Sequence, residues 1–418
     1  MQDPAPEPSR PSAVPTRYIV AAFLAAAFFI ALVAGVIAVA SRPLMARYHY
    51  SIGFGHNQKR QFDGAIAEYT DAIALDPQYA DAYFARGYAW NEKKELDKAI
   101  ADYTVVIRLT SKNASAYINR GAIYSAKRDF DSAIADFNKA IQLDHKAADA
   151  FHWRGYALGE KREFDTALAD YNAALAFDPT DANLYYARGN ALRELKQIDR
   201  AIADFDQAIR LDPMCTLAYF GRGFAWNQKQ QIDKALADYN QAIRLDPTDP
   251  RTLTNRGFIW AEKKEFKKAI ADYDQAIRLS PGDAASYKYR GDALSEVQEL
   301  DKAIADYNEA IRLDPSDAYS YISIAWLLTN APDMRKRDAK RAIAAATKAC
   351  ELTAWKQPGY LETLAGACAA AADFDAAIKW QTKANALLPD PAEKAKGQER
   401  LEYYLSKQME QDYQSAAE

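Results

Sequence analysis

Charged side chains recur at one fixed spacing through most of this chain. An arginine stands directly before a glycine in seven places, and an aspartate recurs at the same spacing. Guanidinium and carboxylate groups can bind a charged ligand, or they can pair with each other through two parallel hydrogen bonds. The residues are Arg86, Arg120, Arg154, Arg188, Arg222, Arg256, Arg290, Asp102, Asp136, Asp170, Asp204, Asp238, Asp272 and Asp306.

The residue patterns of metal and nucleophilic catalysis are missing from the sequence. It contains no HExxH pair, no CxxC, no GxSxG elbow and no phosphate-binding glycine loop. A metal site at His49 and His56 is the alternative to their being half-exposed aromatic residues at the start of the periodic region. The net charge of −4 gives no basic field for nucleic acid. We therefore expect no enzyme, no cofactor, no metal, no nucleic-acid partner and no small-molecule substrate.

The three cysteines are too few, and odd in number, for a disulfide framework. Cys350 and Cys368 can pair only if their helices touch. We expect buried free thiols instead, because cysteine is among the residues most often found buried.

The sequence around these residues repeats at a constant interval. This interval equals the separation between Gly53 and Gly87 in the sequence. Glycines, alanines and aromatic residues keep this period from Gly53 to Tyr307, and prolines close most of the units. In the unit 114–147, Tyr117, Gly121 and Tyr124 share one helical face, and a second apolar helix follows. Asp131 is the expected N-cap of that second helix. Glycine inside a helix costs about 1 kcal/mol relative to alanine, so its recurrence indicates that the second helix approaches too closely for a side chain. We expect Ala133 to make this close contact with Gly121.

The pattern resembles the tetratricopeptide repeat (TPR) family, whose signature combines these aromatic, glycine, alanine and proline positions. The resemblance implies two-helix units that stack into a right-handed superhelical solenoid with a concave inner surface. Eight in-register units occupy 46–317, and two more occupy 318–391, the first of them divergent with an insertion near "NAPDMRKRDAK". The segment 392–413 places Leu401, Leu405 and Met409 on one stripe, which predicts a capping helix.

With the glycine numbered eighth in each unit, the arginine is seventh. At about 100° per residue, it lies to one side of the core stripe, away from the groove positions of the family. The recurring aspartate lies at the edge of the core stripe of the second helix. We predict that Arg120 pairs with Asp136 or with the equivalent aspartate of the neighbouring unit, and that the other six pairs are alike.

The family groove is lined by the second, fifth, ninth, twelfth and thirteenth positions of the first helix. Aromatic side chains there supply large contact area at small entropic cost, and asparagines can hold a peptide backbone. The alternative is that the aromatic residues pack between neighbouring first helices. The candidate partner-binding residues are Phe84, Tyr88, Asn91, His152, Tyr156, Tyr186, Asn190, Phe220, Phe224, Asn227 and Phe258.

The family also includes receptors for the carboxylate tail of chaperones. Their clamp requires lysine at the fifth and asparagine at the ninth position of one unit. Here the unit with Lys288 at the fifth position has Asp292 at the ninth, which repels a carboxylate. This argues against a chaperone-tail receptor.

The N-terminal region differs from the repeats. Residues 1–17 are rich in proline and predict a disordered tail. The segment 18–40 contains no charge and is long enough to span a bilayer, since a membrane helix needs about 20 residues. A cleavable signal peptide is the alternative, because "AVA" before Ser41 resembles a cleavage site, but its apolar core is usually about 7–15 residues. We favour a retained anchor in the lipid bilayer.

We therefore expect an all-α TPR solenoid with an N-terminal transmembrane helix, a C-terminal capping helix at 392–413 and a disordered tail at 414–418. The expected function is a non-catalytic scaffold that binds peptide segments or helices of partner proteins in its groove. The expected location is the bacterial inner membrane, with the repeats in the periplasm. The alternatives are a cytosol-facing receptor of the import type and a regulatory subunit of an enzyme or secretion complex.

Overall fold

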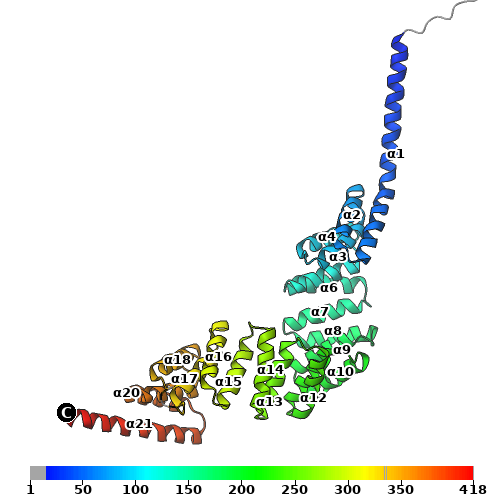
Figure 1. The fold of residues 1–418 in the computed structure, drawn as a ribbon. Coiled ribbons are helices and arrows are strands. Elements are labelled where there is room, and N and C mark those ends of the chain that lie inside the picture. Colours follow the sequence, from blue (N-terminus) through cyan, green and yellow to red (C-terminus); the bar gives the residue numbers. More distant parts are fainter. Residues whose placement is uncertain (1–15, 334, 336, 418) are drawn as a thin grey trace, which may run out of the picture. The chain divides into compact units, whose positions relative to one another are not determined.

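The computed structural model describes residues 16–333, 335 and 337–417, in which the chain folds into successive α-helices (Figure 1). For 16–26, 33–40 and 415–417 only the backbone is described, and the tail predicted at 1–17 lies outside the described residues up to 15. The helices are α1 (Thr16–Gln58), α2 (Phe62–Leu75), α3 (Ala80–Glu92), α4 (Leu96–Leu109), α5 (Ala114–Ala126), α6 (Phe130–Leu143), α7 (Ala148–Glu160), α8 (Phe164–Phe177), α9 (Ala182–Glu194), α10 (Ile198–Leu211), α11 (Thr216–Gln228), α12 (Ile232–Leu245), α13 (Pro250–Glu262), α14 (Phe266–Leu279), α15 (Ala284–Glu296), α16 (Leu300–Leu313), α17 (Ala318–Asn330), α18 (Ala339–Leu352), α19 (Pro358–Ala370), α20 (Phe374–Leu387) and α21 (Pro391–Ala417).

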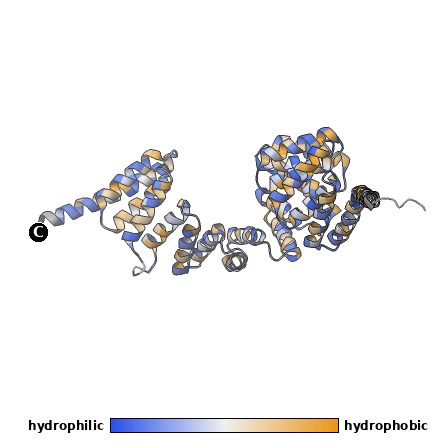
Figure 2. Cartoon of the chain, turned by 90° about the horizontal axis from the view of Figure 1, so that it is seen from above, coloured by the Kyte–Doolittle hydropathy of each residue, from blue (hydrophilic) through white to orange (hydrophobic). Residues whose placement is uncertain are grey.

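The helices pack as helix-turn-helix pairs in chain order. The chain divides into two compact units, residues 1–195 and residues 196–418. Within the first unit, α5 contacts α7 and α7 contacts α9; within the second, α13 contacts α15 and α17 contacts α19. The first helices of successive repeats therefore form one layer, and the second helices pack behind them. Figure 2 shows hydrophobic and hydrophilic residues mixed along the repeat helices, as expected for helices with one buried face.

The recurring glycine lets an aromatic ring of the second helix lie against the backbone of the first. A Cβ at Gly121 would lie 2.8 Å from Cε1 of Phe137, and one at Gly257 would lie 2.7 Å from Cε1 of Tyr273. Both rings are almost fully buried. The predicted close approach is present, but the atoms nearest to Gly121 belong to the ring of Phe137 and not to Ala133, because the long aromatic side chain reaches across to the first helix.

The recurring arginine and aspartate form buried, two-pronged ion pairs. In the six pairs whose geometry the described residues give, the arginine Nε and Nη2 groups donate to the two carboxylate oxygens at 2.6–2.9 Å. The pairs are Arg86–Asp102, Arg120–Asp136, Arg154–Asp170, Arg222–Asp238, Arg256–Asp272 and Arg290–Asp306. Arg188 and Asp204 stand on either side of the boundary between the two compact units.

Each of these arginines also reaches back to the preceding repeat. Its Nη1 donates to a side chain on the preceding second helix, at 2.5–3.0 Å across the series from Arg86 to Arg290. The acceptor is Thr70 for Arg86, Asn172 for Arg188 and Asp274 for Arg290. Each guanidinium therefore links its own repeat to the previous one, so the recurring arginine has a structural role in the frame of the solenoid, by which we mean the packed helix pairs and their ion pairs.

The turn between the two helices of a repeat differs in detail from the prediction. Helix α6 begins at Phe130, and its N-cap is Asp129, whose side chain accepts from the backbone N–H of Ser132. The predicted N-cap, Asp131, is therefore wrong. It lies in the first turn, where a carboxylate favours the helix dipole, and it accepts a hydrogen bond from Lys161 at 2.7 Å.

Helix α1 continues from the apolar N-terminal stretch into the first repeat. The composition change at Arg42 and Pro43 does not end it, and its C-terminal part packs against α2. Among the residues whose side chains are described, which leave out 16–26 and 33–40 of α1, no helix is both long and apolar enough to cross a membrane.

The C-terminal helix α21 packs against α20, with Leu401 of the predicted stripe half-buried and the other two residues of the stripe exposed. Leu405 and Met409 are 41% and 66% exposed, whereas Tyr404 is buried with Leu361 and Leu364. The helix reaches Ala417, past the predicted boundary at 413, because the segment beyond 413 contains two alanines and no glycine or proline that would end it. The face of α21 that is buried contains Tyr404 and Gly397, and Gly397 lies against Asn385 of α20. This face is turned away from the predicted leucine stripe.

The cysteines are free thiols in the described part of the chain. Cys350 and Cys368 lie in the buried cluster of the last repeats, and burial raises the pKa of each thiol to about 11. The prediction of buried free thiols is confirmed for these two residues.

Candidate ligand-binding groove

The fifth-position candidates pack against the core of their own repeats. The ring of Phe84 lies 5.4 Å from that of Tyr103, and the ring of Phe220 lies 6.1 Å from that of Tyr239, measured between centroids. His152 lies 6.1 Å from Tyr171 in the same way, and burial lowers its pKa, so that the imidazole is neutral at pH 7. For these three residues the structure favours the packing alternative.

Three ninth-position candidates, all of them aromatic, are exposed to solvent. Tyr88 and Tyr156 are each 41% exposed, and Phe258 is 37% exposed. The ring of Tyr156 meets the exposed ring of Trp153 edge to face at 6.0 Å. The other candidates on the first-unit helices, Asn91, Tyr186 and Asn190, are half-buried. The two groove positions therefore differ, because the fifth faces the second helix and the ninth faces away from it.

The remaining candidates meet at a cavity of about 720 Å³ between α11, α13 and α15. Phe224, Asn227 and Phe258 line it, together with Tyr289. The Oδ1 atom of Asn227 is buried and has no hydrogen-bond partner among the described residues. Three predicted residues thus come together on the layer of first helices in the second unit.

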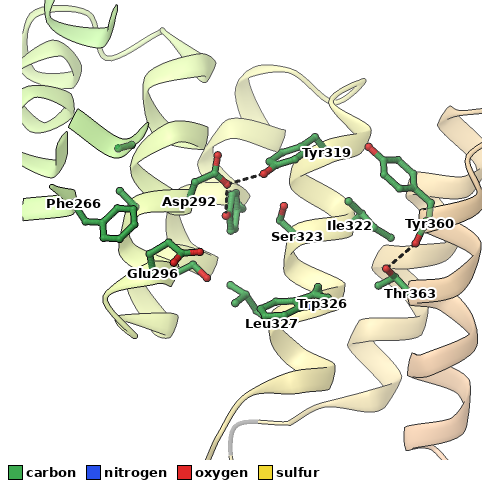
Figure 3. A pocket seen from close by; sticks show the side chains of 15 residues that line it. Phe266, Asp292, Glu296, Tyr319, Ile322, Ser323, Trp326, Leu327, Tyr360 and Thr363 are labelled. Carbon is green, nitrogen blue, oxygen red and sulfur yellow. Dashed lines mark hydrogen bonds between the residues drawn. The ribbon is translucent and has the colours of Figure 1, made fainter. Parts of the chain in front are cut away.

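A second cavity, of about 520 Å³, lies farther along the same layer, between α15, α17 and α19 (Figure 3). Asp292 and Glu296 reach it from α15, and Tyr319, Ser323 and Trp326 from α17. The wall is completed by Phe266, Tyr360 and Thr363. Tyr319 is 44% and Trp326 is 55% exposed, which leaves two large aromatic side chains open to a ligand.

Asp292 is the polar centre of this cavity. Its Oδ1 accepts hydrogen bonds from the hydroxyl groups of Tyr307, at 2.6 Å, and Tyr319, at 3.1 Å. Burial raises the pKa of Asp292, while the two hydroxyl groups and Lys288 oppose that rise. A carboxylate that is partly desolvated in a cavity is a candidate binding group.

A smaller cavity of about 390 Å³ joins the two larger ones. Phe258 and Tyr289 belong to it and to the 720 Å³ cavity, and Asp292 and Tyr319 belong to it and to the 520 Å³ cavity. The three cavities therefore form one continuous depression along α11–α19, which we call the second-unit groove.

Sequence reasoning missed the aromatic and acidic part of this groove. Tyr319 and Trp326 stand at the second and ninth positions of the unit 318–357, so the rule applied to earlier units identifies both once it is extended past the insertion. Asp292 stands at the ninth position of its own unit. Tyr360 stands at a third position, which the rule does not cover.

The two N-terminal histidines bind different neighbours. Nδ1 of His49 lies 2.7 Å from Oε2 of Glu68, and Nδ1 of His56 lies 2.8 Å from Oε1 of Gln61. His49, Glu68 and Asp71 place one potential ligand atom each within 4.8 Å of one another. The two imidazoles therefore do not act as a pair.

Profiles of one repeat family match most of the periodic region. Profiles described as "Tetratricopeptide repeat" match residues 58–114, 114–146, 186–250, 250–283 and 284–317, and one described as "TPR repeat" matches 160–192. The matched segments cover 58–146 and 160–317, which is more than half of the chain. None of the curated proteins with which the sequence was compared matches it.

Solved structures of several repeat proteins are similar to the chain. YrrB, described as a TPR protein with an unusual peptide-binding site, is 27% identical over 44% of this chain and 95% of its own, with a TM-score of 0.36. A tetratricopeptide repeat protein from Parabacteroides merdae is 20% identical over 59% of this chain and 97% of its own, with a TM-score of 0.49. Yeast Tom70 is 16% identical over 88% of this chain and 96% of its own, with a TM-score of 0.40.

The profile matches, the helix pairs and the close glycine contacts agree on one assignment. The chain belongs to the tetratricopeptide repeat family, whose repeats form non-catalytic scaffolds for protein–protein interaction.

Proposed function

We propose that the chain binds a peptide segment of a partner protein in the second-unit groove. The observation that carries this proposal is the run of three joined cavities along α11–α19, with Phe258, Tyr319 and Trp326 exposed in it. Binding surfaces are enriched in large aromatic side chains, and a groove between preformed helices accepts an extended or helical segment at low ordering cost.

The experiment is a capture of partners by the full chain and by a groove variant. We expect Tyr319→Ala with Trp326→Ala to lose the captured proteins, because the two changes remove the exposed rings without touching the ion pairs. The control is Tyr413→Ala, since Tyr413 is 79% exposed on α21 and lies outside the groove. Equal capture by the groove variant and the control, with helical content intact, would refute the proposal.

We further propose that residues 18–40 anchor the scaffold in a membrane, with the repeats in the periplasm of a bacterium. The support is the absence of any charged residue from this segment and the exposure of Phe28, Phe29 and Ile30 at 64–73%. Helix α1 joins this stretch to the first repeat without a break.

Membrane fractionation tests the anchor. The full chain is expected in the alkali-resistant membrane fraction, and a variant with Phe29→Asp and Ala34→Arg in the soluble fraction. Protease added to intact spheroplasts tests the orientation, because it digests repeats that face the periplasm. Recovery of the unaltered chain in the soluble fraction would refute the anchor.

A further inference from the structure

The cavity between α15, α17 and α19 combines acidic groups with aromatic rings. Among the described residues that line it are two carboxylates, Asp292 and Glu296, and no lysine, arginine or histidine. The rings of Phe266, Tyr319 and Trp326 stand in the same wall (Figure 3). The electrostatic potential of such a wall is negative, since both carboxylates and the faces of aromatic rings attract cations.

Asp292 keeps one oxygen available. Both tyrosine hydroxyl groups donate to Oδ1, and Oδ2 accepts no hydrogen bond from a described residue. Tyr307 and Tyr319 fix the carboxylate in place, so it is preorganised for a ligand. Glu296 lies one helical turn later on α15, is exposed, and has no ion-pair partner in the described part of the chain.

Lys288, which acts on Asp292 electrostatically, is not directly paired with this carboxylate. Nζ of Lys288 lies 3.9 Å from Oδ1 of Asp317 and over the ring of Tyr319, 5.8 Å from its centroid. Lys288 lines the neighbouring 390 Å³ cavity instead. Among the described residues, the negative charge at Asp292 therefore lacks a directly paired cation, in contrast with the buried aspartates of the repeat frame.

We propose that this cavity binds the cationic side chain, lysine or arginine, of the partner peptide. The proposal rests on the proposed function, since the peptide reaches the cavity by lying in the second-unit groove. Oδ2 of Asp292 and the carboxylate of Glu296 accept the N–H groups of the cation, and the ring of Trp326 lies against its face. The volume of about 520 Å³ accommodates an arginine side chain and part of the adjoining peptide.

The test uses pools of fluorescent decapeptides with one fixed central residue and random flanks, bound to the full chain in detergent. The fixed residue is arginine, lysine, citrulline or glutamate, so that citrulline keeps the shape of arginine and removes its charge. We expect the arginine and lysine pools to bind roughly tenfold more tightly than the citrulline and glutamate pools. Equal binding of the arginine and citrulline pools would overturn the proposal.

Two variants and a control separate this inference from the proposed function. Asp292→Asn keeps the size and the acceptor for the two tyrosine hydroxyl groups, and is expected to abolish the preference for arginine while leaving weak binding of all pools. Tyr319→Ala with Trp326→Ala is expected to abolish binding of every pool. Glu299→Gln is the control, because Glu299 is an exposed carboxylate paired with Lys302 outside the groove.

The outcomes distinguish the two ideas. If the pools bind, the double variant abolishes binding and Asp292→Asn retains the arginine preference, the cation site is wrong and the peptide groove stands. If no pool binds the wild-type chain above the double variant, both are wrong.

Discussion

Arg290 and Asp292 lie close together on α15, yet their surroundings are opposite. Arg290 donates to Asp306 and Asp274 at 2.6–2.7 Å and closes the gap between two repeats. Asp292 faces the cavity, where hydroxyl groups hold one of its oxygens and the other stays available. Arg290 on the side that faces the second helices is fully paired, whereas Asp292 on the groove side has no directly paired cation among the described residues. A partly satisfied buried charge costs stability, which agrees with the binding role that we propose for Asp292.

Breaking the frame at Arg290 is expected to have the largest effect. Arg290→Ala leaves the buried Asp306 and the nearby Asp274 without a counter-charge, which should lower the free energy of unfolding by about 3 kcal/mol. Urea unfolding followed by circular dichroism measures this. Arg312→Ala removes an exposed arginine paired with Glu309 on α16 and should leave the midpoint unchanged. Similar midpoints for the two variants would show that the frame pairs do not stabilise the fold.

The second largest loss of stability is expected from Gly291→Ala, at the residue between Arg290 and Asp292. A Cβ there would lie 2.9 Å from Cε1 of Tyr307, so Gly291→Ala must displace the ring that holds Asp292. The expected loss is about 1–2 kcal/mol, because overpacking exceeds the gain in helix propensity. The control is Gly159→Ala, where no atom lies within 4 Å, and it should gain about 1 kcal/mol. Thermal unfolding of both variants gives the comparison.

The loop that joins α15 to α16 holds both faces in position, and its conformation is strained. Gln298 has a φ of 63°, a backbone conformation that residues other than glycine rarely adopt. Gln298→Gly should therefore stabilise the chain by about 0.5–1 kcal/mol without changing peptide binding. Glu299→Gly, at the adjacent residue with a φ of −84°, should not stabilise it. A loss of stability in Gln298→Gly, measured by urea unfolding, would contradict the strain.

The smallest expected effect on stability comes from Asp292→Asn, which changes the groove side of α15 and leaves the ion pairs of Arg290 intact. Because burial raises the pKa of Asp292, its ionisation disfavours the fold, and Asp292→Asn should raise the melting temperature at pH 7. The protonated form adds stability that is complete below the ordinary value of 3.8 and is lost as the pH rises through the folded pKa. The difference in melting temperature between Asp292→Asn and the wild type should therefore grow as the pH rises through the folded pKa of Asp292 and then stay constant.

The charged and titratable groups around Asp292 set the limits of that prediction. Lys288 on the same helix lowers its pKa, Asp317 before α17 raises it, and the hydroxyl groups of Tyr307 and Tyr319 lower it. A melting temperature of Asp292→Asn below that of the wild type at pH 7 would mean that the hydroxyl groups outweigh burial.

The sequence predicted the frame in detail and the groove only in part. The repeat period established the register, and the register predicted that Arg120 pairs with Asp136 or its equivalent in the neighbouring unit and that Gly121 lies against the second helix. The structure shows that the partner is Asp136. It did not separate fifth from ninth positions, since both are aromatic and only packing shows that Phe84 faces Tyr103 while Tyr88 faces solvent. The sequence also favoured Leu405 in the last helix, where Tyr404 is the buried residue, because helical periodicity alone cannot fix the rotation of a helix that packs on one neighbour.

The sequence by itself determined the family, the repeat register and the pairing of recurring charges, because each depends on local helical geometry that is copied in every unit. The tertiary structure decided which residues form the groove. The joined cavities draw on α11–α19, and their shape depends on the packing of successive first helices. Asp292, Tyr319 and Tyr360 come from three repeats, and only stacking brings them to one cavity.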